Sequence, residues 1–594
     1  MEKEGLRETL SKDFLSIMRE IKKNGAKDEK ANDKLYKKKI ALLGAGSLQY
    51  FAAILKYCLQ ISGIDAELLI GTYKGLEMDV MDDSSEYNSF QPDVTVIFSS
   101  YRDVMQYPAM HESEEKVWEM VWEEIGKYEI LWEKIYRRNG SYILQTNLVT
   151  PIERKMGNLE ANYIWSRQTY LELLNYGFQK KKKNFVSILD FNYLASIEGK
   201  EKWFDFPNYY LNKSNMSYAS LPGAVEEVVL NILNYCGINK KCIVLDLDNT
   251  IWGGILEEAG VENINIFPDD PIGEAFLDFQ KYLKGLKERG VILAVCSKND
   301  IDFAKEVFQT NKNMILRLED ISCFIANWEN KADNIRQIAA DLNIGLNSIV
   351  FVDDNPVERD LVQSILPEVE VLALSEDPAN YVLDMEKAKY FEWLQITEED
   401  ANRTNSYKAK EALKVMLQNY DNYDDYLSSL GMEGSIEEVT PQSIARTAQL
   451  FNKSNQFNSV RFRGTEAQLL KLQEEGRILL TCQLRDKFAN YGLVACAILE
   501  IENDKCIVTA WAMSCRVFKR TLEKYMLNEF TKIALRNRCN KLIVLFIPNE
   551  RNGMVKEMLE ENGFCESADT GQYCLAIDES IYFENKINEV KRNG

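Results

Sequence analysis

Six polar residues in the middle of the chain lie where the end of a strand or the start of a helix is predicted. The runs 242–245, 291–296 and 348–352 should be buried strands, because each is short and, apart from Ser348, apolar throughout. Open parallel sheets place their chemistry at the carboxyl ends of such strands. The six residues are Asp246, Asp248, Ser297, Lys331, Asp353 and Asp354.

These residue types, in this order, can transfer a phosphoryl group. The Asp246 carboxylate can attack phosphorus and carry the group as an aspartyl-phosphate, and Asp248 can protonate the leaving oxygen and then activate water. Ser297 and Lys331 can hold and neutralise the phosphoryl oxygens, which is the dominant need in this reaction. A single Asp after a strand is usually a helix cap, but four such elements in order favour catalysis.

Mg2+ is the cation that suits this set of hard oxygen ligands. We expect Asp246, the backbone carbonyl of Asp248 and Asp353 to coordinate it, with Asp354 assisting. The order Asp-x-Asp, Ser, Lys, Asp-Asp resembles the four motifs of the haloacid-dehalogenase (HAD) phosphatases. HAD enzymes that act on small molecules usually insert a cap domain, and the segments after the first and second motifs are too short for one. The resemblance therefore implies a capless, open site that suits a substrate presented by a protein.

Composition narrows the remaining function classes. The net charge of −21 argues against nucleic-acid binding, which depends on Lys and Arg neutralising phosphates. Twelve cysteines without a CxxC pair fit reduced thiols and not a disulfide framework or a zinc site. No run is long and apolar enough to span a membrane, and the charged N-terminus has no signal-peptide core, so we expect a cytoplasmic protein. The only histidine is His111, so a Ser-His-Asp triad would have to use it.

The chain is long enough for several domains, and its patterns divide it into three. One apolar helical stripe is predicted near the N-terminus, followed by a polar linker up to residue 37. From Lys39, alternating strand and helix patterns predict a parallel sheet with covering helices. We place the domain limits at 1–236, 237–395 and 396–594.

Five segments together resemble the FkbH-like family, and the resemblance covers roughly residues 185–570. They are DLDNTIWGG (246–254), VCSKND (295–300), FVDDNPVERD (351–360), FNKSNQFN (451–458) and MSCRV (513–517). The resemblance implies a multidomain α/β protein with a degenerate SGNH-hydrolase-like N-terminal α/β domain, a capless Rossmann-like HAD domain and a GNAT-like α+β acyltransferase domain. Ser47 could match the SGNH serine, but the sequence has no Asp-x-x-His element, so hydrolase activity is not expected there.

The known activity of the FkbH-like family implies a function. Its members take D-1,3-bisphosphoglycerate, capture the glyceryl unit as a thioester, remove the phosphate and deliver glyceryl to the phosphopantetheine arm of an acyl carrier protein in polyketide biosynthesis. Two alternatives stay open. One is a phosphatase of a phosphoprotein or phospho-sugar that uses the GNAT-like unit for docking, and the other is a non-catalytic scaffold.

The thioester route needs a reactive thiol, and Cys515 is the best placed by position. It follows a predicted strand and precedes a helix with basic residues nearby, and both features lower a thiol pKa. Cys296 also lies beside the phosphoryl site, but strand alternation should point it away from Ser297. The opposing interpretation is that Cys515 is an inert buried thiol.

The same segment offers groups for the carrier arm. Three amide side chains could bind pantetheine or glyceryl, or could simply cap a helix: Asn455, Gln456 and Asn458. An acyl carrier protein is usually acidic, so docking needs a local basic face on this acidic chain. The candidates for that face are Arg516, Lys519, Arg520, Arg536 and Arg538.

Overall fold

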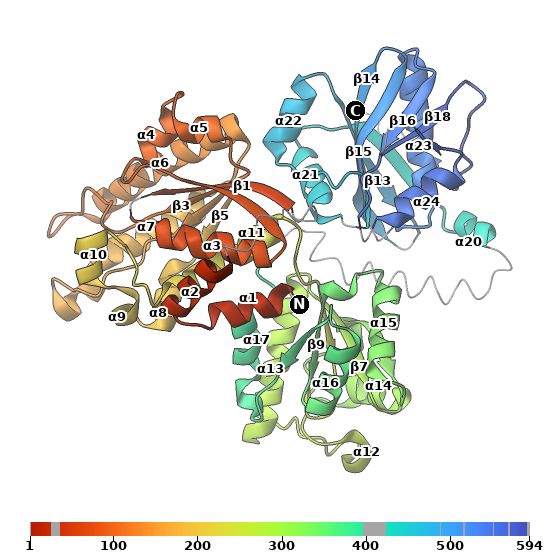
Figure 1. Cartoon of the computed structure of the whole chain (residues 1–594). Helices are drawn as coiled ribbons and strands as arrows, with labels where there is room; N and C mark the ends of the chain where they lie inside the picture. The colour runs from red at the N-terminus through yellow and green to blue at the C-terminus, as the bar shows by residue number, and fades with distance from the viewer. Residues whose placement is uncertain are drawn as a thin grey trace. The chain divides into compact units, whose positions relative to one another are not determined.

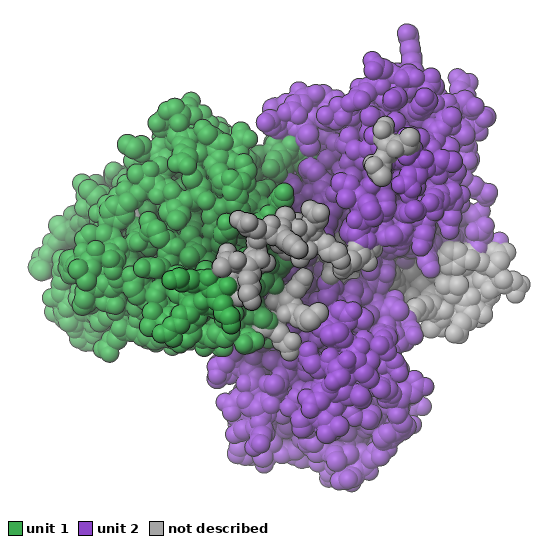
Figure 2. Space-filling view, in the orientation of Figure 1, with its two compact units in different colours: residues 1–236, 465–470 green, residues 237–464, 471–594 purple. Residues whose placement is uncertain are grey.

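The structure is a computed structural model, and it forms two compact units (Figure 2). One unit holds residues 1–236 with 465–470, and the other holds 237–464 with 471–594. The described residues are 2–24, 36–44, 46–395, 423–454, 456–487, 489–514, 517–549, 552–567 and 571–590. Within these ranges no helix is both long and apolar enough to cross a membrane.

Unit 1 is built on a five-stranded parallel sheet in the order β2-β1-β3-β4-β5. Its strands are β1 (Tyr36–Gly44), β2 (Ile64–Ile70), β3 (Val94–Phe98), β4 (Tyr142–Thr146) and β5 (Val186–Leu189). Helices cover both faces (Figure 1): α3 (Gln49–Ile61), α6 (Glu114–Asn139), α7 (Arg167–Lys181) and α11 (Leu221–Tyr235). This is the parallel α/β domain that the sequence predicted.

The N-terminal stripe forms two helices and not the single predicted one. They are α1 (Glu2–Leu10) and α2 (Phe14–Asn24). The break comes at Asp13, whose carboxylate accepts hydrogen bonds from the backbone N–H of Ser16 at 3.1 Å and from its hydroxyl at 2.6 Å. A short acidic side chain in this position starts a new helix, and the apolar spacing alone could not reveal that.

A second parallel sheet lies in unit 2, in the order β10-β9-β6-β7-β8. Its strands are β6 (Cys242–Leu245), β7 (Ile292–Ser297), β8 (Ile321–Ala326), β9 (Ile349–Asp353) and β10 (Glu370–Ala373). Alternate strand residues enter separate cores, so that Leu245 packs with α13 (Pro271–Glu288) on one face and Val244 packs with α15 (Lys331–Leu342) on the other. No separate domain interrupts the chain between β6 and β8 in this fully described stretch, so the site is capless as predicted.

The C-terminal part of unit 2 is an α+β fold around a mixed nine-stranded sheet. Its central strands β13 (Ile478–Arg485), β14 (Asn490–Glu502) and β15 (Lys505–Met513) are antiparallel. The helix α23 (Leu522–Arg536) then crosses to β16 (Lys541–Leu545), which pairs parallel with β15. Three antiparallel strands therefore precede α23, and one strand parallel to β15 follows it.

Candidate active site

The ends of β6, β7 and β9 bring the predicted residues together. Leu245 pairs with Val295 of β7 and Val352 of β9, so the residues that follow all three strands emerge at one edge of the sheet. The backbone N–H of Asp246 continues this register by donating to the Val352 carbonyl at 2.9 Å. Asp246, Ser297 and Asp353 are all buried at this edge.

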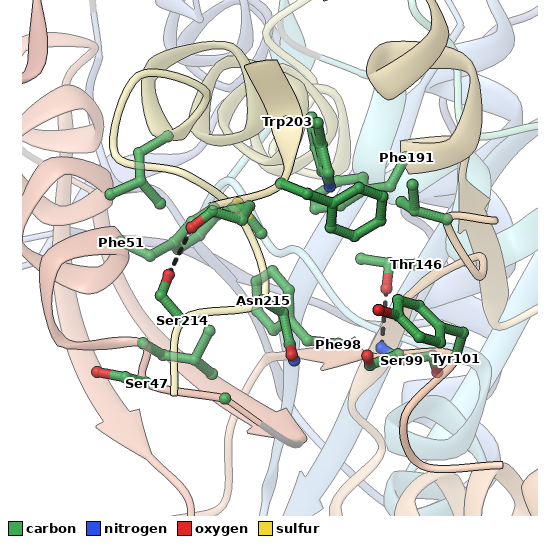
Figure 3. Close-up of a pocket in the computed structure, with 17 residues that line it drawn as sticks. Ser47, Phe51, Phe98, Ser99, Tyr101, Thr146, Phe191, Trp203, Ser214 and Asn215 are labelled. Atoms are coloured by element: carbon green, nitrogen blue, oxygen red, sulfur yellow. Dashed lines mark hydrogen bonds between the residues drawn. The ribbon is translucent and has the colours of Figure 1, made fainter. Parts of the chain in front are cut away.

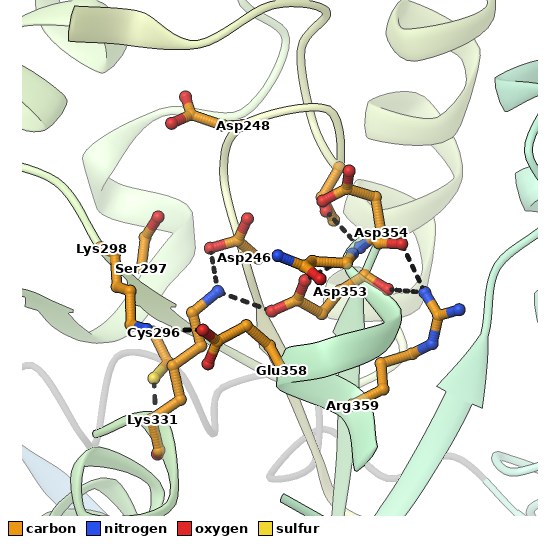
Figure 4. Close-up of polar contacts among 12 residues, drawn as sticks. Asp246, Asp248, Cys296, Ser297, Lys298, Lys331, Asp353, Asp354, Glu358 and Arg359 are labelled. Carbon is orange, nitrogen blue, oxygen red and sulfur yellow. Dashed lines mark hydrogen bonds and ion pairs between the residues drawn. The ribbon is translucent and has the colours of Figure 1, made fainter. Parts of the chain in front are cut away.

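Lys331 is a buried cation between two buried carboxylates (Figure 4). Its Nζ donates to Asp246 Oδ1 at 2.7 Å and to Asp353 Oδ2 at 2.6 Å. Asn330 caps α15 by accepting from the Ala332 N–H, and this fixes Lys331 as the first helical residue. The two carboxylates raise the pKa of Lys331, which is therefore charged, whereas burial raises the pKa of Asp246 and of Asp353.

Three carboxylates converge as a cation site would require. One oxygen each from Asp246, Asp353 and Asp354 lies within 4.8 Å of the other two. Arg359 donates to the backbone carbonyls of Asp353 and Asp354 at 2.7 and 2.6 Å, and the Thr250 hydroxyl accepts from the Asp354 N–H at 3.2 Å. These bonds hold the turn after β9 in place. The all-oxygen donor set fits Mg2+, and a divalent cation would relieve the repulsion between buried carboxylates.

Asp248 is held apart from this group by three N–H donors. Its Oδ1 accepts from Trp252 Nε1 at 2.9 Å and from the Leu256 backbone at 3.1 Å, and its Oδ2 accepts from Asn299 Nδ2 at 3.1 Å. In Figure 4 its carboxylate lies away from the Asp246–Lys331 pair. The Asp248 side chain is therefore not part of the carboxylate cluster. The predicted metal contact is unaffected by this, because it used the backbone carbonyl of Asp248.

Asn299 links two predicted residues and was missed by the sequence reasoning. Its Nδ2 also donates to Ser297 Oγ at 3.1 Å, so one buried amide orients both Ser297 and Asp248. Asn299 lies within the segment VCSKND and Trp252 lies within DLDNTIWGG. Their place in these motifs was the available signal, but the contact to Asp248 depends on the fold.

Cys296 points away from the catalytic edge, as strand alternation predicted. Its side chain packs in the core on the α15 face, and its Sγ lies 3.8 Å from the Lys331 carbonyl oxygen. Burial raises the pKa of the Cys296 thiol to about 12. It is therefore a poor nucleophile at neutral pH.

The predicted carrier-binding residues divide into three groups. Cys515, Arg516 and Asn455 lie outside the described residues. The structure places Gln456 beside β12 (Phe457–Asn458), with its Oε1 buried and without a partner among the described residues. Asn458 is buried, and its amide donates to the backbone carbonyls of Phe451 and Ser454 at 3.2 and 3.3 Å, so it holds the end of a helix.

The position of Arg520 is not the one expected for a member of the predicted basic docking face. It is only 5% exposed, its guanidinium donates to Asp486 Oδ2 at 2.5 Å, and it lies over the Tyr491 ring. A buried and paired arginine cannot dock an acidic partner, so Arg520 stabilises the C-terminal fold instead. The other three described members of the predicted basic face, Lys519, Arg536 and Arg538, are exposed.

Comparisons with known proteins agree with this geometry. Residues 39–234 match the family model described as FkbH, N-terminal domain. The crystal structure of the N-terminal part of the protein BF1531 from Bacteroides fragilis, containing phosphatase domain complexed with Mg, is 32% identical, with a TM-score of 0.55. That match covers 66% of this chain and 98% of the other. The chain belongs to the FkbH-like family of HAD phosphatases.

The family model matches residues 39–234 of this FkbH-like protein, which lie in unit 1. Most of the matched range therefore precedes residues 185–570, over which the motifs indicated the resemblance. The ribosomal-protein-S18-alanine N-acetyltransferase from Escherichia coli matches 25% of this chain over 99% of its own, at 16% identity and a TM-score of 0.20. A GNAT-family acetyltransferase from Streptococcus pneumoniae matches 25% over 100%, at 15% identity and 0.20. Such distant likenesses bear on neither activity nor substrate. A comparison with curated proteins gave no match.

Proposed function

We propose that this protein is a bifunctional glyceryl transferase and phosphatase that loads glyceryl onto an acyl carrier protein. The observation that carries the phosphatase half is the buried Lys331 between Asp246 and Asp353, with Asp354 beside them, at the capless edge of a HAD-type sheet. The transferase half rests on membership of the FkbH-like family, whose members perform this reaction.

The phosphatase step follows from the residues at the sheet edge. Lys331 engages Asp246 through Oδ1, so the other oxygen is the one to attack phosphorus. The P–O bond to the leaving group breaks as the Asp246–phosphorus bond forms, and Asp248 gives its proton to the leaving oxygen. Asp248 then takes a proton from the water that releases phosphate and restores Asp246.

Ser297 and Lys331 would hold the phosphoryl oxygens during both displacements. Asp246, Asp353, Asp354 and the backbone carbonyl of Asp248 would hold Mg2+, the ion with which the related BF1531 fragment was crystallised. When bound, Mg2+ supplies charge that stabilises the phosphoryl oxygens.

The transfer half needs no nucleotide, because bisphosphoglycerate is already an acyl phosphate. A thiolate attacks the acyl carbon, a C–S bond forms, and the C–O bond to phosphate breaks. The HAD site then hydrolyses the remaining phosphate ester. Cys515 is the proposed thiol, and the carrier's phosphopantetheine thiol displaces it in the last step. The alternative is a phosphatase of a phosphoprotein or phospho-sugar that uses the GNAT-like unit for docking.

Intact-mass analysis after incubation with D-1,3-bisphosphoglycerate and Mg2+ separates the two proposals. We expect a glyceryl adduct that hydroxylamine removes and that Cys515→Ala lacks. Cys296→Ala is the matched control, because that buried thiol should leave the adduct intact. An adduct lost only in Cys296→Ala would mean that the wrong cysteine is assigned. Phosphate release without any adduct would support the phosphatase alternative.

A further inference from the structure

A pocket in unit 1 lies outside the machinery described above. Its empty space is about 550 Å³, a figure that includes open solvent at its mouth. It opens at the carboxyl edge of the five-stranded sheet, between residues that follow four of the strands. Ser47 follows β1, Tyr101 follows β3, Thr146 ends β4 and Phe191 follows β5.

The topology of the sheet creates this opening. The chain leaves β1 towards β2 on one side and later returns to β3 on the other side, because the order is β2-β1-β3-β4-β5. Connections that depart in opposite directions leave a crevice at the carboxyl ends of β1 and β3. Ligands of open α/β sheets bind at such a switch point.

Aromatic side chains form part of the walls, because six of the 17 lining residues are Phe, Tyr or Trp (Figure 3). Phe98 meets Phe51 edge-to-face, with ring centroids 4.9 Å apart, and Phe191 packs against Trp203 at 5.8 Å. These four side chains are at most 5% exposed, so the walls are fixed by the core of the domain. Rigid apolar walls favour the apolar body of a ligand and exclude bulk water.

The lining contains no charge. None of the 17 described residues that line the pocket is Asp, Glu, Lys, Arg or His. Two nearby arginines, Arg102 and Arg167, lie 4.9 Å over the Tyr101 ring and do not line the pocket. A charged ligand would lose its hydration here without gaining a counter-ion, so the pocket selects an uncharged one.

The hydroxyl of Tyr101, in the lining, has no hydrogen-bond partner among the described residues. The Tyr101 side chain is 3% exposed, and this hydroxyl is buried. An unmade hydrogen bond at a buried hydroxyl is costly, and an acceptor on a ligand would remove that cost. Figure 3 shows Tyr101 beside Thr146 and Ser99, on the polar side of the pocket.

The pocket is equipped for binding and not for ester hydrolysis. The Ser47 hydroxyl donates to Gln49 Oε1 at 2.6 Å, and its backbone N–H donates to the Lys213 carbonyl at 2.9 Å. A serine nucleophile needs a base and a free N–H for the oxyanion. His111 is the only histidine; its ring lies tilted against Trp165, with centroids 5.4 Å apart, and it does not line the pocket.

We propose that this pocket holds, without chemical change, an uncharged ligand that joins an apolar body to one carbonyl acceptor, as in an amide or ester. The apolar body lies against the aromatic walls, and the carbonyl oxygen accepts from the Tyr101 hydroxyl. This proposal is independent of the proposed phosphatase and transferase activity, because unit 1 contains none of the residues assigned to either.

Three probes of equal chain length test the proposal on the full-length protein: hexanamide, hexanoate and hexylammonium, titrated by ligand-observed NMR. We expect hexanamide to bind at least ten-fold more tightly than either ion. Tyr101→Phe should weaken hexanamide several-fold, whereas Tyr176→Phe removes an exposed hydroxyl outside the pocket and should change nothing.

Several outcomes would overturn the proposal. If hexanamide and hexanoate bound equally well, the pocket would not select against charge. If hexanamide did not bind at all, the proposed class of ligand would be wrong. Equal effects of Tyr101→Phe and Tyr176→Phe would remove the assigned donor. Hydrolysis of p-nitrophenyl hexanoate that disappears in Ser47→Ala would show chemistry where only binding is proposed.

Discussion

Removal of the Lys331 charge should destabilise the sheet that carries the phosphoryl site. Lys331→Met keeps the length and apolar stem of the side chain but leaves Asp246 and Asp353 without their shared cation. The three side chains are 4%, 8% and 0% exposed. Removing one partner from a buried ion pair costs about 3–5 kcal/mol, because the remaining charge has lost its water and its counter-ion.

The cost should depend on pH in a defined direction. Burial raises the pKa of Asp246 and Asp353, and Lys331 opposes the rise. Such a carboxyl has a higher pKa in the folded than in the unfolded state, so it destabilises the fold only when it ionises. Below the unfolded pKa it has no effect on stability, and above the folded pKa its destabilising effect is complete. Lys331→Met raises both folded values further. The destabilisation should therefore be greatest near pH 8 and smaller at pH 5, in protein freed of divalent ions by a chelator.

Hydrogen exchange measured by mass spectrometry on peptides of β6 and β9 would report this change locally. A loss of 3–5 kcal/mol corresponds to roughly 150- to 5,000-fold faster exchange, after correction for intrinsic rates. The matched control is Lys281→Met, whose pair with Asp278 is 61% and 59% exposed; its loss should leave the exchange rates unchanged, because water screens an exposed pair. Equal exchange in both variants at pH 8, or a larger effect at pH 5 than at pH 8, would refute the electrostatic reasoning.

Three further predictions concern single side chains. Asp246→Asn should abolish Mg2+-dependent phosphate release without faster exchange in β6, because an amide cannot attack phosphorus; turnover by a variant whose mass excludes deamidation would contradict this. Trp252→Phe removes one hydrogen-bond donor to Asp248 and should slow the hydrolysis of alkyl phosphates about 3- to 10-fold. Hydrolysis of p-nitrophenyl phosphate should not change, because its leaving group needs no general acid. Equal losses with both substrates would contradict the role of Trp252 in positioning Asp248. Arg520→Met should destabilise β13 and β14 by about 3 kcal/mol, measured by hydrogen exchange, and leave phosphate release unchanged; weaker carrier transfer at unchanged stability would restore its docking role.

The convergence of Asp246, Ser297, Lys331 and Asp353 was predictable because its signal is local. A short apolar run before Asp246, Ser297 or Asp353 marks a buried parallel strand, and such strands end at one edge of the sheet. Lys331 was identified by a different local signal, because it was predicted to be the first residue of a helix. The four sites therefore converge once the strands pair, and no long-range information was needed to name them.

The supporting contacts were not predictable, because they join residues far apart in sequence. Asn299 reaches Asp248 across 51 positions, and Arg520 finds Asp486 across 34. Composition around Arg520 indicated an exposed basic face, since basic residues near a loop are usually solvated. Its burial follows from packing against Tyr491, which only the folded sheet creates.

The unit 1 pocket shows the same division between local and long-range information. The candidate serine Ser47 was visible in the sequence, and so was the lack of an Asp-x-x-His element. The aromatic walls of the site were not visible, because Tyr101 lies in the segment after β3 whereas Phe191 and Trp203 lie in the segment after β5. Aromatic residues at these positions are indistinguishable from ordinary core residues until the strand order is known.

The most direct test is to trap the phosphoryl group on Asp246. Rapid acid quench during turnover, followed by borohydride reduction, converts an aspartyl-phosphate into homoserine, which peptide mass spectrometry locates. The expected result is homoserine at position 246 only when substrate and Mg2+ are both present, and none at Asp248 or Asp353. Turnover at full rate with no modification of Asp246, or with the phosphoryl group on another residue, would contradict the assignment of Asp246 as the nucleophile.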